Sequence, residues 1–309
     1  MLRFLKHILC FSLLILLLAT IFDMMVSHGL SKTQRGHFYT INALMGKPLD
    51  ADIIILGNSR AACSYNPTIL DSILLVDSRN LGVSGQPFGV SYLRWQLYGR
   101  NNKAPRLVII NIDYGELNIV VNGYEREQYY PYMKDTLIKP YLDLYGFSWA
   151  DKHLPMYRYR GDYKLMAIGL GELLNLHHDV KGEYIKGYSN PNSAWDGNKL
   201  SRVIKRGNVQ DSCNPDAVEL LDSLLKQGKE DGIDFVFCYA PMYDLLKQNL
   251  DEQRSKNKYI ELANRYNIPI LDYSSEWYCS DTSYFMDANH LNARGAELFT
   301  TELANAMIH

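Results

Sequence analysis

The sequence predicts an α/β fold in which a parallel sheet is covered by helices on both faces. Short, apolar, β-branched runs alternate along the chain with segments of helical spacing, and turn-forming or polar residues follow the first three runs. A strand that is buried on both faces gives a continuous apolar run, whereas a half-exposed strand gives an alternating pattern. Strands that alternate with helices are typical of parallel sheets.

The first strand is expected over Asp52–Leu56, where the run ends in Gly57-Asn58-Ser59 and a tight turn must follow. Further strands are expected at 77–83, 107–112, 233–239 and 268–272. Asn-Pro pairs at 66–67 and 214–215 indicate helix starts, because Asn caps a helix and Pro is tolerated at its first position. The predicted helices are 67–75, 90–98, 214 to just before Gly232, 250–266 and 291–307.

The N-terminus carries an unbroken apolar run, Ile8–Phe22, after Arg3, Lys6 and His7. With Met24 to Val26 it approaches the roughly 20 residues that span a bilayer. We expect a retained transmembrane signal anchor over 1–26, with a cleaved signal peptide as the alternative. Positive charge before the run predicts a cytoplasmic N-terminus and an extracytoplasmic remainder, periplasmic or at the cell surface.

After the anchor, 27–50 is expected to be a linker or first packing element, followed by one α/β domain over 51–309. The net charge of −2 provides no basic excess for nucleic acid. We find no zinc-type spacing and no phosphate-binding glycine loop, so we expect neither metal nor cofactor. The four cysteines beyond the anchor allow disulfides in an oxidising compartment without selecting a pairing, and Cys238 lies in an apolar strand typical of a buried thiol.

Three residues lie just past predicted strand ends: Ser59, Gly85 and Asp113. Ligands of parallel α/β sheets bind beyond these carboxyl ends. A serine on a strand-to-helix turn projects its hydroxyl as a nucleophile. The glycine that ends Asn80-Leu-Gly-Val-Ser-Gly85 exposes a backbone N–H suited to an oxyanion. Each signal alone also fits an ordinary glycine-rich turn.

The sequence Asp287-Ala-Asn-His290 leads into the last predicted helix. An aspartate three residues before a histidine can accept a hydrogen bond from one ring nitrogen, which leaves the other nitrogen to take a serine proton. A capping turn with a solvated histidine is the alternative for this stretch.

Four segments resemble, in this order, the sequence blocks of the SGNH/GDSL hydrolase superfamily: the strand and turn that end at Ser59, the stretch Asn80–Gly85, the strand that ends near Asp113, and the C-terminal stretch from Asp287. The most specific of them is Asp287-Ala-Asn-His290-Leu-Asn-Ala-Arg-Gly-Ala. The resemblance covers 52–115 and 233–307. It implies a flavodoxin-like three-layer α/β/α sandwich. It also implies Ser59 as nucleophile, His290 as base, Asp287 as its orienting partner and Gly85 as an oxyanion donor.

The third block departs from the family pattern. Where the family offers an asparagine to the oxyanion, this chain has Asp113, and Asn111 falls two residues early. Either Asp113 is protonated and donates, or it points away and the Ser59 and Gly85 backbone N–H groups form the hole.

An irregular, tyrosine-rich stretch at 118–212 interrupts the domain. Because it follows a site strand, it is expected to be an inserted lid, with tyrosines placed to stack on sugar rings. The alternative is a subdomain whose tyrosines pack against the sheet. The stretch holds Tyr129, Tyr130, Tyr132, Tyr141, Tyr145, Tyr157, Tyr159 and Tyr163.

The resemblance, together with the anchor, implies an esterase or acyl-transfer enzyme acting on O-acyl groups, which we expect to be acetyl, of envelope or exported polysaccharide. Its partners would be the membrane, the acylated carbohydrate and, for transfer, a membrane acyl donor. The alternative, favoured by Asp113, is a non-catalytic carbohydrate-binding or assembly protein that keeps the fold.

Overall fold

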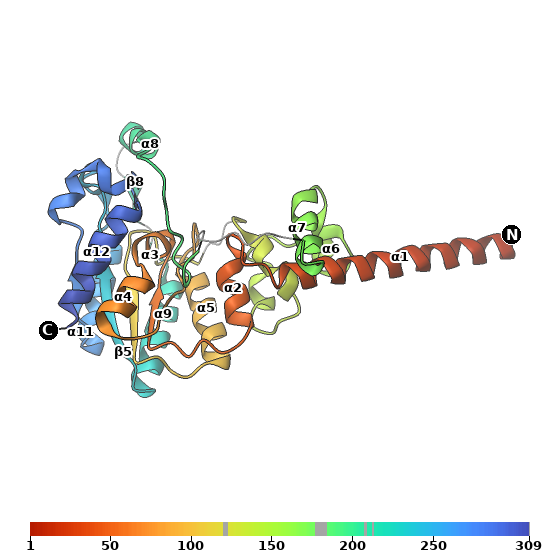
Figure 1. Ribbon diagram of the computed structural model, residues 1–309, viewed down its shortest axis with the longest axis horizontal. Coiled ribbons are helices and arrows are strands. Elements are labelled where there is room, and N and C mark those ends of the chain that lie inside the picture. The colour runs from red at the N-terminus through yellow and green to blue at the C-terminus, as the bar shows by residue number, and fades with distance from the viewer. Residues whose placement is uncertain (120–122, 177–183, 207–208, 212, 309) are drawn as a thin grey trace. The chain divides into compact units, whose positions relative to one another are not determined.

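The computed structural model describes residues 1–119, 123–176, 184–206, 209–211 and 213–308 (Figure 1). The chain forms two compact units. Unit 1 comprises Met1–Asn42 and Glu125–Lys181, and unit 2 comprises Ala43–Tyr124 and Gly182–His309.

Unit 2 contains a parallel five-stranded sheet in the order β2-β1-β3-β5-β7. This is the flavodoxin-like order, in which β2 is added on one side of β1 and all later strands of the sheet are added on the other side. The predicted fold class is therefore confirmed. The strands are β1 (Ile53–Leu56), β2 (Ser78–Asn80), β3 (Leu107–Asn111), β5 (Asp234–Tyr239) and β7 (Ile270–Asp272).

Helices cover both faces of this sheet. On one face, Ile53 and Ile55 of β1 share a buried cluster with Phe299 and Leu303 of α12 (Ala293–Ala306). On the other face, Phe237 of β5 meets Tyr259 edge-on at 5.8 Å between ring centroids. The first layer contains α3 (Ser59–Ser64), α4 (Pro67–Leu74) and α12, and the second contains α5 (Phe88–Asn101), α9 (Pro215–Glu230) and α11 (Gln253–Tyr266).

The Asn-Pro pairs begin helices as predicted. Asn66 accepts a hydrogen bond from the backbone of Thr68, and Asn214 accepts one from Asp216. Two predicted helices begin later than expected, because their first residues form short strands. Leu250–Asp251 is β6, which pairs with β4 (Val209–Gln210), and His290–Leu291 is β9, which pairs with β8 (Phe285–Asp287). The remaining elements of unit 2 are α8 (Asn198–Arg206), α10 (Asp244–Lys247), η4 (Trp277–Ser280) and η5 (Thr282–Tyr284).

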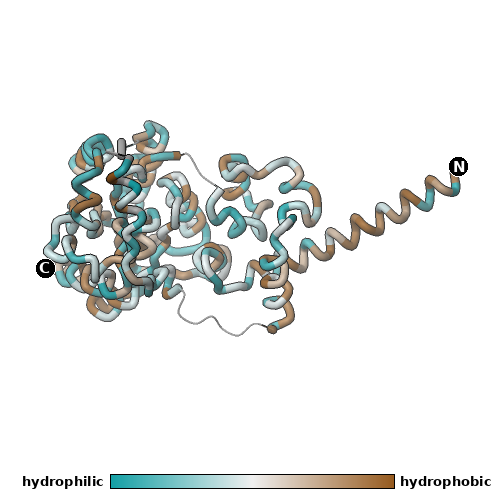
Figure 2. Tube along the Cα trace, turned by 90° about the horizontal axis from the view of Figure 1, so that it is seen from above, coloured by the Kyte–Doolittle hydropathy of each residue, from teal (hydrophilic) through white to brown (hydrophobic). Residues whose placement is uncertain are grey.

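Unit 1 is built on the long helix α1 (Leu2–Leu30), the one described helix that is long and apolar enough to cross a membrane. Its apolar shaft is evident in Figure 2. Gly29 of α1 lies so close to Gly169 of α7 (Tyr163–Leu173) that a Cβ on either residue would collide with the other helix. The other elements of unit 1 are η1 (Arg126–Tyr132), η2 (Lys139–Tyr141), α6 (Trp149–His153) and η3 (Tyr157–Tyr159), and α2 (Phe38–Met45) lies across the boundary between the units.

The middle segment is organised differently from the prediction. Instead of one insertion over 118–212, residues 125–181 belong with α1 in unit 1, and the part from 182 onward belongs with the sheet in unit 2. The segment 27–50 is a packing element, since α1 continues to Leu30 and α2 follows. The lid role itself stays a prediction.

Four of the eight tyrosines expected in the lid are buried against one another in unit 1. Tyr129 and Tyr145 lie 4.9 Å apart between ring centroids, and Tyr130 meets Tyr159 edge-on at 5.3 Å. All four are buried. They therefore form the core of unit 1, and neither of the roles expected for them, sugar stacking or packing on the sheet, describes them.

Candidate active site

Ser59 is presented by the turn that follows β1. Gly57 has φ +144°, and a Cβ there would come within 2.9 Å of Ala61 and Asn111 side-chain carbons, so the turn requires glycine. Asn58 then caps α3 by accepting the backbone N–H of Arg60 at 2.8 Å. Ser59 is the first residue of α3, where backbone N–H groups have no acceptor within the helix.

Asp287 and His290 are held together by the β8–β9 hairpin. Asp287 accepts the backbone N–H groups of Asn289 at 2.7 Å and His290 at 3.1 Å. The same carboxylate lies 2.9 Å from Nδ1 of the His290 ring. The carboxylate thus fixes both the hairpin turn and the ring tautomer, with the proton on Nδ1.

The two parts meet at the carboxyl end of β1. Nε2 of His290 lies 2.7 Å from Oγ of Ser59, although the residues are 231 positions apart in the chain. The His290 side chain is 12 % exposed and that of Asp287 is 23 % exposed, so the constellation is reachable from solvent. With Nδ1 protonated, Nε2 is the acceptor that can take the Ser59 proton.

Asp113 belongs to a separate buried ion pair. Its Oδ1 accepts from Nη1 of Arg60 at 2.6 Å, its Oδ2 accepts from Asn58 at 3.0 Å, and the backbone N–H of Tyr114 donates to it at 2.8 Å. All three partners donate, so the carboxyl group acts as an acceptor. Of the two alternatives for Asp113, this geometry favours the one in which it does not serve the oxyanion.

Arg60 connects the ends of two strands through the same network. Its side chain is 1 % exposed, and it also donates to the carbonyls of Ala240 and Pro241, just past β5. Burial opposes the charged form, but the Asp113 carboxylate raises the pKa of the Arg60 guanidinium above its ordinary value. No local pattern predicted this role, because Arg60 simply follows Ser59 and its partners Asp113 and Ala240 are distant in the chain.

Asn111 and Gly85 also have defined places. Asn111 is fully buried at the end of β3, where its Oδ1 accepts the Tyr65 hydroxyl at 3.0 Å. Gly85 has φ +66° in the turn after β2, and a Cβ there would come 2.9 Å from the Tyr124 ring. Asn111 is thus part of the core, whereas the role of Gly85 as an oxyanion donor stays a prediction.

The stretch from Asn80 to Gly82 supports α3, the helix that begins at Ser59. Nδ2 of Asn80 donates to the carbonyls of Ala61 at 2.8 Å and Tyr65 at 2.9 Å, which holds the end of α3 against the end of β2. Gly82 passes so close to the backbone of Ala62 that a side chain would not fit. This block is therefore a structural support for Ser59, a role that sequence reasoning missed.

One acidic side chain and one tyrosine near the ion pair have shifted pKa values. Burial, and then the charge of Asp113, raises the pKa of Glu116 well above its usual range. The same two causes raise the pKa of Tyr114 to about 12. The Tyr114 hydroxyl donates to Oδ1 of Asn289 at 3.1 Å, next to His290, and so connects the ion pair to the β8–β9 hairpin.

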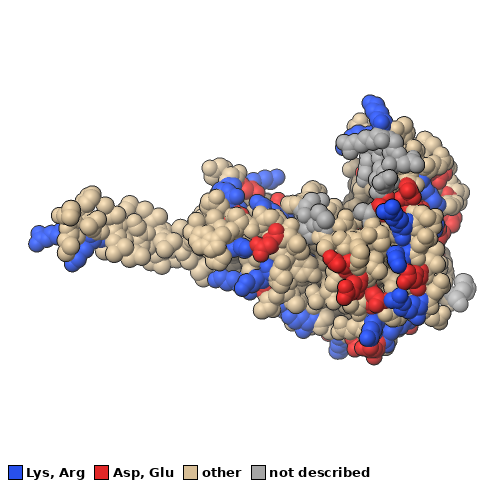
Figure 3. All heavy atoms as spheres, turned by 180° about the vertical axis from the view of Figure 1, so that it is seen from behind, with Lys and Arg blue, Asp and Glu red and all other residues tan. Residues whose placement is uncertain are grey.

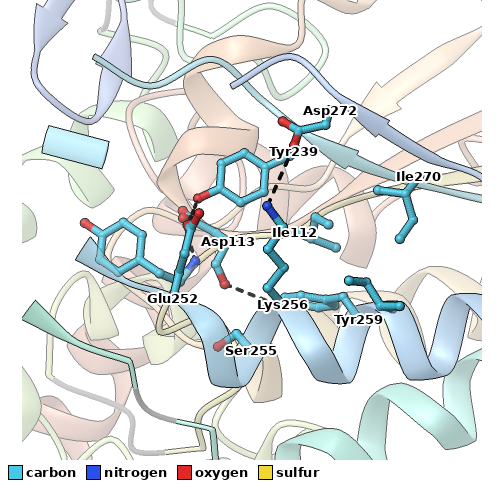
Figure 4. Close-up of a pocket in the computed structure, with 11 residues that line it drawn as sticks. Ile112, Asp113, Tyr239, Glu252, Ser255, Lys256, Tyr259, Ile270 and Asp272 are labelled. Carbon is cyan, nitrogen blue, oxygen red and sulfur yellow. Dashed lines mark hydrogen bonds and ion pairs between the residues drawn. The ribbon is translucent and has the colours of Figure 1, made fainter. Parts of the chain in front are cut away.

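A cavity of about 120 Å³ is lined in part by Asp113 and lies between α11 and the ends of β3, β5 and β7 (Figure 4). Tyr239 points toward Glu252 within it, and Lys256 lies 4.0 Å from Asp272 at its rim. None of Ser59, Asp287 and His290 lines this cavity. Within the described residues, no group of three or more His, Cys, Asp or Glu side chains is arranged to hold a metal ion.

No family model matches the chain, and no curated protein matches it. Among solved structures, it is similar to a protein of Desulfitobacterium hafniense DCB-2 described as lipolytic and of the G-D-S-L family, at 11 % identity over 82 % of this chain and 97 % of that one, with a TM-score of 0.40. It is also similar to a protein of Bacteroides fragilis NCTC 9343 described as an acylhydrolase, at 14 % identity over 90 % and 98 %, with a TM-score of 0.39. Both scores are below 0.5, so the fold assignment rests on the sheet order of this chain.

Proposed function

We propose that this chain is a membrane-anchored serine hydrolase or acyl-transfer enzyme that acts on ester-linked acyl groups. The observation that carries the proposal is the unbroken series of contacts from Ser59 Oγ to His290 Nε2 at 2.7 Å, and from His290 Nδ1 to Asp287 at 2.9 Å. These distances are within the range for proton transfer between nucleophile and base.

In the proposed reaction, Oγ of Ser59 attacks the ester carbonyl carbon while Nε2 of His290 takes the hydroxyl proton. The tetrahedral intermediate collapses to an acyl-enzyme, and the imidazolium returns the proton to the departing alcohol. Water, or the hydroxyl of an acceptor, then repeats these steps in reverse. Asp287 stabilises the imidazolium and remains ionised. The backbone N–H groups of Ser59 and Gly85 would receive the oxyanion.

The substrate follows from the family resemblance and from the anchor. Such a chain would remove or transfer acetyl groups on an envelope or exported polysaccharide. The location is supported by α1 and by the cations before it. A C-terminal alkaline phosphatase fusion is expected to be active and a green fluorescent protein fusion dark. The reverse pattern would remove the extracytoplasmic location and, with it, the envelope substrate.

The test of the chemistry is covalent trapping. The full chain in detergent is treated with a fluorophosphonate, and the labelled peptide is identified by mass spectrometry. We expect a single label, on Ser59, in the wild type. The variant His290→Ala is expected to take no label. Ser64, a buried serine of the same helix α3, is the internal comparison. A folded chain that takes no label at Ser59 would instead be a binding or assembly protein.

A further inference from the structure

The surroundings of α1 change at Asp23. Large apolar side chains between Leu2 and Phe22 are exposed, and Lys and Arg side chains gather at the free tip of the helix but not along its shaft (Figure 3). Asp23 is buried, accepts the backbone N–H of Met156 at 2.8 Å and forms an ion pair with Arg158. One turn later, Ser27 contacts the Tyr159 hydroxyl at 2.7 Å.

The position of this change matches the thickness of a bilayer. At about 1.5 Å per residue, the 20 steps from Arg3 to Asp23 span about 30 Å, the thickness of the hydrocarbon core. Tyr157 lies between the two residues that contact Asp23, and it is 39 % exposed. Amphipathic aromatic rings are typical of the level where the headgroups begin. We therefore take Asp23 and Tyr157 to mark the outer interface.

A cavity of about 490 Å³ begins at this level and follows α1 for two turns. Its lining comes from α1 on one side and from the η1 region, Lys152 and Arg158 on the other. All of these residues belong to unit 1. The lining residues are Asp23, Met24, Ser27, His28, Ser31, Tyr130, Pro131, Tyr132, Met133, Lys134, Asp135, Lys152 and Arg158.

The basic side chains of this cavity differ in how they are paired. Lys134 is exposed and makes no ion pair within the described part of the chain, whereas Lys152 lies 2.6 Å from Asp143, whose side chain is 75 % exposed. Arg158 is paired with Asp23, yet its Nε is buried without a hydrogen-bond partner. By contrast, the lining carboxylates are engaged, since Asp135 accepts the backbone N–H groups of Leu137 and Ile138. Such a lining suits a phosphate group.

We propose that this cavity binds the headgroup of a membrane phospholipid, with its phosphate facing Lys134 and Lys152. The acyl chains would lie along α1 on the N-terminal side of Met24, a residue that lines the cavity and is 65 % exposed. The inference rests on the proposed membrane anchoring. Its consequence is that unit 1 is fixed to the outer leaflet by a bound lipid in addition to the helix.

The test is native mass spectrometry of the full chain released from detergent and titrated with phosphatidylglycerol. We expect one lipid to bind the wild type, and at least tenfold weaker binding to the double variant Lys134→Glu and Lys152→Glu. The matched control is Lys139→Glu and Lys164→Glu, which makes the same charge change at exposed residues of unit 1 that do not line the cavity. This control is expected to bind lipid as the wild type does.

A second variant tests the site by occlusion. Ser31 lines the cavity at the end of α1, and its hydroxyl makes only an exposed hydrogen bond to the His28 carbonyl among the contacts described. Ser31→Trp is expected to exclude the lipid without a charge change. Equal lipid binding by all variants, or equal loss in both double variants, would show lipid held around α1 in general and would overturn the proposal.

Competition with inorganic phosphate and with phosphatidylethanolamine tests whether the cavity binds a lipid headgroup or a free anion. Competition by millimolar inorganic phosphate would point to a free anion and overturn the lipid assignment. Displacement by phosphatidylethanolamine but not by inorganic phosphate would support it. Fluorophosphonate labelling of the wild type is scored separately. A labelled chain that binds no lipid refutes only the headgroup site, whereas lipid binding without labelling refutes only the proposed enzyme.

Discussion

Ser59 and Arg60 are adjacent in the chain, yet they belong to two hydrogen-bonded groups with different surroundings. Ser59 meets a partly exposed His290 at 2.7 Å, whereas Arg60 and Asp113 are almost completely buried and 2.6 Å apart. The first group is reachable from solvent, as the proposed chemistry requires. The second group joins the ends of β3 and β5 next to the turn that presents Ser59.

The difference in burial predicts different consequences of mutation for the two groups. Removing a group from the exposed set should change the rate and leave the fold intact, because solvent can replace the lost contact. Removing a group from the buried set should lower the free energy of unfolding, because its partner is left charged, buried and without water. The two sets are therefore distinguished by measuring activity and stability on the same variants.

The largest effect is expected for the triad. Ser59→Ala and His290→Ala should each lower turnover of a short-chain aryl ester by about 10⁴-fold or more, while the apparent Tm stays close to that of the wild type. The double variant should lose little beyond either single one, since triad members act as a unit. Wild-type turnover in Ser59→Ala would end the assignment of the nucleophile.

The buried pair should show the opposite pattern. Arg60→Met leaves the Asp113 carboxylate buried without its cation, which should lower the free energy of unfolding by about 3–5 kcal/mol. Replacing both residues, by Met at 60 and Leu at 113, should recover part of that loss. Asp113→Asn should also destabilise, and it should not raise turnover. Thermal unfolding of the full chain in detergent measures each case, and an unchanged Tm in Arg60→Met would mean that the pair is not structural.

Glu116 gives a pH test of the buried region. Because its folded-state pKa is raised, the folded chain keeps a proton that the unfolded chain releases. Its contribution to stability is complete below the unfolded pKa and is lost as the pH rises toward the folded value, by up to about 1.4 kcal/mol per pH unit.

Glu116→Gln should therefore flatten the decline of stability between about pH 5 and 8. Urea unfolding at several pH values measures the slope, and Glu230→Gln, a change at an exposed helix end, is the control. Equal slopes in Glu116→Gln and the wild type would show that Glu116 ionises normally in the folded chain.

The smallest effect concerns the contact between the two groups. Tyr114→Phe removes the hydroxyl that donates to Asn289 at 3.1 Å, next to His290. The loss of one such bond should cost about 0.5–1.5 kcal/mol of stability and change turnover by a few-fold at most. A fall in turnover as large as that of His290→Ala, at unchanged stability, would show that the buried network positions the base.

Several features could be predicted from local sequence, because the forces behind them act over a few residues. The apolar runs around Ile54 and Val108 predict buried parallel strands. The Asn66-Pro67 pair predicts a helix start, and three positions on one turn let Asp287 reach His290. The apolar run of α1 is likewise a matter of composition. Predicted helix boundaries were wrong where pairing with another strand set them. Leu250, for example, was predicted to begin a helix but pairs with Val209 in a short strand.

Only the tertiary structure decided the rest, because those contacts join residues far apart in the chain. The sequence placed Asp113 at the end of a site strand, but its carboxylate faces Arg60, and that depends on how β3 and α3 pack. Tyrosines such as Tyr129 form the core of unit 1 because their rings pack against one another, and the spacing of these tyrosines in the sequence did not predict that packing. The approach of His290 to Ser59 across 231 residues is of the same kind, since only the folded chain brings a C-terminal hairpin to the end of the first strand of the sheet.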